Sequence, residues 1–222
     1  IDGILDGTIP KEKHRHYMQI VSEETKRLSR LVRSMLDISR LQDQDIPEEK
    51  KKTTVRSSGC GLCCACMTVD LLTDKSLEIE ECVRIAEECG ANHSVGTNMT
   101  VLAPVIAEKF GLTYSKTNDL DEAIKHLQNG GAVISHVGIP EGASIGLFTK
   151  SGHYISLIST DGDEFCILDP SWSAEKYKIP ERLGRVNEDN YPYLYCDVNT
   201  VHSETKPGKT KYHLFARKKE QK

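Results

Sequence analysis

The sequence predicts an α+β fold in which helices come first and an antiparallel sheet follows. From residue 53 onward, segments with helical spacing precede a region in which apolar and polar residues alternate. Several helical segments end at a glycine, which is the usual residue just beyond a helix C-terminus. A run of helices followed by a run of strands is typical of α+β domains.

Four helices and four strands are expected in this domain. The helices cover Cys60 to about Thr73 and the segments SLEIEECVRIAEECG, MTVLAPVIAEKFG and LDEAIKHLQNGG. Gly90 and Gly111 are expected to end the second and third of them. The strands are expected in GAVISHVG, HYISLIS, DEFCILD and KYHLFARK, where the period of the apolar residues shortens towards two.

The first 42 residues differ from the rest and predict one long helix of the dimerisation type. Thr8 is suited to cap its start and Pro10 to lie in its first turn. Residues spaced alternately by four and three form an apolar stripe with one defect: Tyr17, Val21, Glu24, Leu28, Leu31, Met35 and Ile38. A helix of about 30 residues is roughly 45 Å long. We therefore expect a homo-oligomer formed through residues 10–42, the alternative being a helix packed on its own domain.

A charged segment separates this helix from the domain. Residues 43–52, DQDIPEEKKK, offer almost nothing to bury and are expected to be a linker. The predicted organisation is therefore a helical segment over 1–42, a linker over 43–52 and a folded domain over 53–222.

Composition excludes several classes of function. The 222-residue chain has a formal charge of -4 and a pI near 6.1, which gives no reason to expect nucleic-acid partners. No run approaches the roughly 20 apolar residues of a membrane span. The crowding of the eight cysteines does not resemble a disulfide framework, so we expect free thiols in a reducing, cytoplasmic setting. No cofactor is expected.

Four cysteines in SSGCGLCCACM allow three interpretations. A structural zinc site usually joins two separated pairs of ligands, whereas Cys60, Cys63, Cys64 and Cys66 are crowded together. The redox interpretation of Cys60 and Cys63 as a C-x-x-C pair lacks a surrounding βαβ pattern. Both are less favoured than a single reactive thiol, and no bound metal is expected.

The third interpretation places Cys60 at the start of a helix. Gly59 and Gly61 flank it and allow close approach of other backbone. The unpaired N–H groups at a helix N-terminus favour a thiolate there. The later cysteines of the cluster would then fill the core. A nucleophile of this kind needs a basic side chain nearby, and His153 is the strongest candidate.

His153 and Asp169 are expected to face each other across a β-hairpin. A two-residue turn at 161–162 would pair His153 with Pro170. A three-residue loop at 160–162 instead pairs His153 with Asp169 and matches apolar residues along both strands. Asp169 would then orient the imidazole as the third member of a catalytic triad. The alternative is an aspartate that only caps the turn before Pro170.

The segments SGCGLCCACM, GLFTKSGHYISLIS and CILDPSW resemble the papain-like cysteine peptidases that process bacteriocin leaders at double-glycine sites, and more closely their stand-alone bacterial relatives. The resemblance covers roughly residues 53–200. It implies a papain-like fold, with Cys60 as nucleophile, His153 as base and Asp169 as orienting carboxylate. The family's oxyanion-binding Gln is replaced by Thr54, so Thr54 or Ser57 is expected to supply a weak substitute.

The segments DGILDGTIP and IVSEETKRLSRLVRSMLDISRL resemble the dimerisation and phosphotransfer region of sensor histidine kinases. This resemblance covers about 42 residues and lacks the phospho-accepting box of that family. It implies that residues 1–42 are a fragment of a helical hairpin, made of the end of a first helix, a turn and a whole second helix. It also implies self-association and no kinase activity. The chain begins without Met, so a true N-terminus is expected to be missing.

Together these features predict a cysteine peptidase, or a related thiol hydrolase, that acts on a peptide or protein. The alternative is a catalytically inactive papain-like module that binds peptides and dimerises through its N-terminal helix.

Overall fold

The computed structural model describes residues 4, 7–22, 25–26, 29, 59–93 and 96–218. Its central element is a seven-stranded antiparallel sheet with the strand order β3-β9-β4-β5-β6-β8-β7. The strands are β3 (Leu112–Thr117), β4 (Ala132–Val137), β5 (His153–Thr160), β6 (Glu164–Leu168), β7 (Asn187–Asn190), β8 (Tyr193–Asp197) and β9 (Tyr212–Arg217). The predicted α+β class is confirmed.

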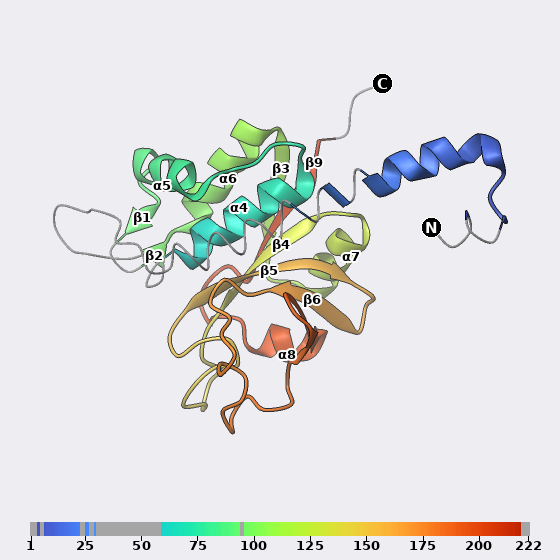
Figure 1. The fold of residues 1–222 in the computed structure, drawn as a ribbon. Helices are drawn as coiled ribbons and strands as arrows, with labels where there is room; N and C mark the ends of the chain where they lie inside the picture. The colour runs from blue at the N-terminus through green and yellow to red at the C-terminus, as the bar shows by residue number, and fades with distance from the viewer. Residues whose placement is uncertain are drawn as a thin grey trace.

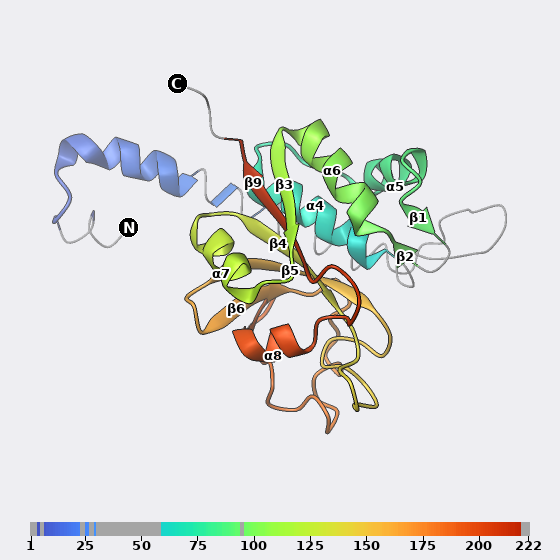
Figure 2. The same ribbon diagram turned by 180° about the vertical axis from the view of Figure 1, so that it is seen from behind.

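Helices cover both faces of this sheet (Figures 1 and 2). On one face lie α4 (Cys60–Leu72), α5 (Ile79–Glu88) and α6 (Met99–Phe110), with the short strands β1 (Asn92–His93) and β2 (Gly96–Thr97) at their edge. On the other face lie α7 (Leu120–Gln128) and α8 (Val198–Ser203).

The sheet separates two hydrophobic cores because alternate residues of its strands point to opposite faces. In β4, Ile134 packs with the α4–α6 side and Val133 packs with the α7–α8 side. In β5, Tyr154 packs on the α4–α6 side and Ile155 on the α7–α8 side. The central strands are therefore apolar on both faces, which explains why β4 is buried along almost its whole length.

The predicted helices and strands occur close to their expected limits. The helix expected from Cys60 ends at Leu72, and the left-handed Gly111, with φ +69°, follows α6 as its C-terminal residue. The four expected strands correspond to β4, β5, β6 and β9. Three further strands of the sheet, β3, β7 and β8, and the helix α8 were not expected from the pattern.

The N-terminal segment is described only in part. Residues 11–22 are helical, so the helix begins directly after Pro10. The predicted cap at Thr8, with Pro10 in the first turn, is therefore wrong by two residues. Tyr17, the first member of the predicted stripe, is 38% exposed, and the neighbouring Met18 and Ile20 are also exposed. The stripe positions beyond Val21 and the linker lie outside the described residues. In the part of the chain that the structure describes, no helix combines the length and apolarity needed to cross a membrane.

Candidate active site

Cys60 is the first residue of α4, and its local structure favours a negative charge. Gly59 precedes it as the N-cap and supplies no side-chain hydrogen bond, and the first turn contains no acidic residue. The first N–H groups of a helix have no acceptor within the helix. They and the helix dipole therefore favour a thiolate at this position.

Gly61 is required by a close approach of β2 to the start of α4. A Cβ atom at this position would lie 2.8 Å from Cβ of Thr97, well inside the normal contact distance. The close approach predicted at this glycine is made by the side chain of Thr97 and not by backbone, and it brings Thr97 beside the start of α4.

His153 is the first residue of β5 and is buried, with 6% of its surface exposed. Its Nε2 atom lies 2.7 Å from Oδ1 of Asp169. The contact leaves Nδ1 as the ring nitrogen available to Cys60, with which His153 forms a side-chain hydrogen bond. The structure therefore brings together Cys60, His153 and Asp169, in the order expected of nucleophile, base and orienting carboxylate.

The register predicted for the β5–β6 hairpin is wrong by three residues next to the loop and by two residues further along. Ser159 pairs with Cys166 rather than with Asp163, and, beyond a shift in the pairing, Leu157 pairs with Ile167 rather than with Phe165. A β-bulge there and a longer loop, in which Asp161 Oδ1 accepts hydrogen bonds from two following backbone N–H groups, account for the difference.

His153 and Asp169 still meet because an offset of two residues, which holds beyond the bulge, keeps the side chains there on their original faces. The strand pairing ends at Leu168, and the backbone N–H of Trp172 donates to the Asp169 carbonyl in the turn that carries Ser171. Ser171 Oγ lies 3.0 Å from Nε2 of His153. The contact between His153 and Asp169 is thus made just beyond the end of β6 and not by two directly paired strand residues.

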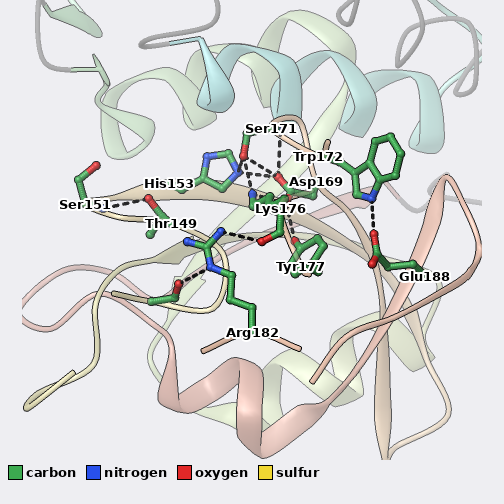
Figure 3. Close-up of polar contacts among 11 residues, drawn as sticks. Thr149, Ser151, His153, Asp169, Ser171, Trp172, Lys176, Tyr177, Arg182 and Glu188 are labelled. Carbon is green, nitrogen blue, oxygen red and sulfur yellow. Dashed lines mark hydrogen bonds and ion pairs between the residues drawn. The ribbon is translucent and has the colours of Figure 1, made fainter. Parts of the chain in front are cut away.

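Asp169 is surrounded by donors that the sequence did not predict (Figure 3). Its Oδ2 atom accepts a hydrogen bond of 2.5 Å from the Tyr177 hydroxyl and pairs at 2.5 Å with Nζ of Lys176. Its Oδ1 atom also accepts hydrogen bonds from the backbone N–H and the hydroxyl of Ser171. Burial alone would raise the pKa of this carboxyl, but Lys176 and His153 hold the pKa well below its ordinary value.

The loop after Asp169 is held from two sides. Trp172 donates from Nε1 to Oε1 of Glu188 at 2.7 Å, and its ring stacks on Tyr191 with 3.9 Å between centroids. Arg182 donates from Nη1 to the carbonyl of Lys176 and from Nε to the carbonyl of Gly146. These contacts, drawn in part in Figure 3, fix the loop that places Ser171 and Lys176 beside the imidazole.

The pKa values of Cys60 and His153 are those of an ion pair. Burial raises the pKa of the Cys60 thiol, but the facing His153 and hydrogen bonds from the backbone of Tyr154 and Gly61 outweigh it, so the pKa is lowered. Burial alone would lower the pKa of His153, but Asp169 and Cys60 raise it to about 9. Both shifts favour the thiolate–imidazolium form of the pair over the neutral form.

The other cysteines of the cluster are chemically different from Cys60. Cys63, Cys64 and Cys66 are buried in the core, and burial raises the pKa of Cys63 and Cys64 well above the ordinary value. A hydrogen bond with Cys82, together with burial, does the same for Cys66. All eight cysteines lie in the described part of the chain and are free thiols, as expected. Among the described residues no group of three or more His, Cys, Asp or Glu side chains is placed to hold a metal ion.

Thr54 and Ser57, the predicted substitutes for the oxyanion-binding Gln, lie outside the described residues. Lys176 and Tyr177 were missed because no periodic pattern surrounds them. Lysine is also rarely buried unless it is paired. The one feature that could have pointed to Lys176 is that a buried Asp169 needs a positively charged partner.

Cys60 and His153 should have opposite effects on the pH dependence of stability. The lowered pKa of Cys60 contributes stability above its ordinary value of 9.0, which is lost as the pH falls through the folded pKa. The raised pKa of His153 contributes stability below 6.5, which is lost as the pH rises through about 9. Between the folded pKa of Cys60 and pH 9 the two contributions change in opposite directions with pH, so they offset each other.

We therefore expect the free energy of unfolding to depend less on pH in the wild type than in Cys60→Ala, where it should fall as the pH rises. In the variant His153 titrates without an opposing group, and its pKa lies below about 9 because the thiolate that helped to raise it is gone. The slope reaches at most about 1.4 kcal/mol per pH unit. Urea unfolding at pH 7.5, 8.0 and 8.5 measures it, and the double variant Cys60→Ala/His153→Ala should be flat. Equal slopes in the wild type and Cys60→Ala would contradict the ion pair.

Comparison of the chain with models of known protein families gives no match. Comparison with curated proteins gives no match either.

Proposed function

We propose that this protein is a papain-like cysteine peptidase, or a related thiol hydrolase, that cleaves amide bonds. The observation that carries the proposal is the buried chain of contacts from Cys60 through His153 to Asp169, in which the nucleophile has a lowered pKa and its neighbouring thiols do not. Perturbed pKa values in a specific charge network are typical of catalytic groups.

In the proposed reaction the Cys60 thiolate attacks the carbonyl carbon of the substrate amide. A C–S bond forms and the carbonyl π electrons move to oxygen, giving a tetrahedral oxyanion. The oxyanion collapses, the C–N bond breaks, and the imidazolium of His153 gives its proton to the leaving amine. Neutral His153 then takes a proton from water as the water attacks the thioester, and the C–S bond breaks to release the acid.

The backbone at the start of α4 stabilises the oxyanion. Backbone N–H groups of the first helical turn have no acceptor within the helix and lie beside the attacking sulfur. Removal of one oxyanion donor commonly costs about 10²–10³ in rate. With Thr54 in place of the family's Gln, we expect a slower enzyme than a peptidase that has the full set of donors.

The resemblance to leader-processing peptidases supports the same assignment from the sequence. It puts the nucleophile at a helix start, the base at a strand start and the carboxylate just after the next strand. Cys60, His153 and Asp169 have these places in α4, β5 and the segment after β6. A peptide or protein is therefore the proposed substrate class.

Reaction with iodoacetamide tests the proposal without a known substrate. At neutral pH, Cys60 should be alkylated at least tenfold faster than Cys63, Cys64 or Cys66, because only its pKa is lowered. Peptide mass spectrometry of the intact full chain, quenched at intervals, gives the rate at each site. Equal labelling of Cys60 and its neighbours would favour the inactive peptide-binding module instead.

We also propose that residues 10–42 join copies of the chain through their apolar stripe. Tyr17, a stripe residue on the described part of this helix, is exposed, which supports an additional partner for the stripe. Light scattering on the full chain should show an oligomer, and Leu31→Asp/Met35→Asp should give a monomer. The matched control Arg33→Asp/Ser34→Asp changes residues off the stripe and should remain oligomeric. A monomeric wild type would refute the proposal.

A further inference from the structure

The Lys176 ammonium is a buried charge that the proposed mechanism does not use. Its side chain is only 7% exposed, although lysine is almost never buried without a reason. It lies seven residues after Asp169, in the loop that follows β6. Figure 3 shows it between Asp169 and Ser171.

Lys176 reaches the catalytic base by two routes. In the first, Asp169 is shared: Oδ1 lies 2.7 Å from Nε2 of His153 while Oδ2 lies 2.5 Å from Nζ of Lys176. In the second, Ser171 Oγ lies 2.5 Å from Nζ and 3.0 Å from Nε2. These two contacts keep the ammonium and the imidazole nitrogen at most 5.5 Å apart.

The position of Lys176 is fixed by its surroundings. Arg182 donates to its backbone carbonyl, and its neighbour Tyr177 donates to the same Asp169 oxygen. Burial lowers the pKa of Lys176, whereas Asp169 and Cys60 raise it and Arg182 lowers it further. The ammonium therefore acts on Cys60 as well as on Asp169.

We propose that Lys176 is a positioning residue. By sharing Asp169 with His153, its ammonium weakens the electrostatic attraction between the carboxylate and the imidazolium. It thereby sets the pH range over which Cys60 and His153 exist as an ion pair. This inference rests on the proposed function. Because Lys176 pairs with Oδ2 of Asp169, the carboxylate attracts the imidazolium less strongly, and His153 releases its proton to a leaving amine more readily. A general acid works best when its pKa lies near the working pH.

The proposal predicts the direction in which the pKa values of Cys60 and His153 change when the charge of Lys176 is removed. A nearby cation favours the deprotonated form of every group around it, so removing the charge of Lys176 should raise the pKa values of both Cys60 and His153. The other titratable groups that face these residues remain in place: Arg182, Tyr177, Cys63, Cys64, Tyr154 and His136. We expect both pKa values to move up by roughly one pH unit.

The experiment compares Lys176→Met and Lys176→Gln with the wild-type full chain. Lys176→Gln keeps a hydrogen-bond donor for Asp169 and lacks the charge. Tyr177→Phe is the matched control, because it removes a neutral donor from the same carboxylate oxygen. The pH dependence of Cys60 alkylation by iodoacetamide reports the pKa of Cys60. Titration of the His153 ring by ¹H–¹³C NMR reports the pKa of His153.

We expect both pKa values to rise in Lys176→Met and in Lys176→Gln. In Tyr177→Phe the rise should be less than half as large. A merely structural role would lower the alkylation rate and leave the pKa values unmoved, which would overturn the inference. Equal shifts in Tyr177→Phe, or a Lys176→Gln chain that does not fold, would overturn it as well. If Cys60 has an ordinary pKa in the wild type, the proposed function itself fails.

Discussion

Replacing Cys60 with alanine is expected to abolish acyl-enzyme formation. With p-nitrophenyl acetate as a probe, the wild type should release a burst of about one p-nitrophenol per chain and gain one acetyl group in mass, because the Cys60 thiolate takes the acyl group. The alanine variant has no nucleophile, and its acylation rate should fall by roughly 10⁴-fold or more. Stopped-flow absorbance and intact mass spectrometry measure the two quantities.

The matched control is Cys63→Ala, which removes a buried thiol one turn further along α4. It should keep the burst, because the pKa of Cys63 is raised well above its ordinary value by burial. His153→Ala should keep the thiol and slow acylation, since the sulfur loses its cationic partner. An unchanged burst in Cys60→Ala would mean that another residue is acylated and would contradict the assignment of Cys60 as the nucleophile.

The second large effect is expected in the stability of Asp169→Asn. From the sequence alone this change is expected to preserve the fold, because it affects only the imidazole tautomer. The structure alters that expectation, since the substitution leaves the Lys176 ammonium buried without its counter-charge. Loss of one partner of a buried ion pair costs about 3–5 kcal/mol. Urea unfolding near pH 7 should show a loss of this order.

The double variant Asp169→Asn/Lys176→Met separates the two effects. Removing the stranded ammonium should recover a large part of the lost stability, because no uncompensated charge then remains. It should not recover the acylation rate, since His153 still lacks the carboxylate that holds its productive tautomer. A double variant less stable than Asp169→Asn would show that the Lys176–Asp169 pair is not the source of the loss.

The parts of the fold predicted from the sequence are those with a strong local signal. The start of α4 was identified from the glycines around Cys60, and the end of α6 from Gly111. The strands β4, β5, β6 and β9 have apolar residues in short runs bounded by turns. In contrast, β7 contains only Asn, Glu and Asp, and it forms because β8 offers a free edge.

The candidate site was predicted in its members but not in its geometry. The contact of His153 with Asp169 depends only on which face each residue occupies, and the alternation of side chains carries that information. The bulge between Leu157 and Ser159 leaves no comparable signal, so the register could not be obtained. Lys176 reaches Asp169 through an irregular loop, whose course is set by tertiary contacts such as that of Arg182.

The division of the domain into two cores has a consequence for how the proposed activity would be lost. Cys60 belongs to the helical layer formed by α4, α5 and α6, whereas His153 and Asp169 belong to the sheet. The nucleophile and its base are thus attached to different layers, and their separation depends on how those layers dock. A displacement of about 1 Å between reacting groups can cost roughly 10² in rate. A molecule that loosens the packing of α4 on β5 would therefore inhibit the proposed activity from a distance, without occupying the place of the substrate.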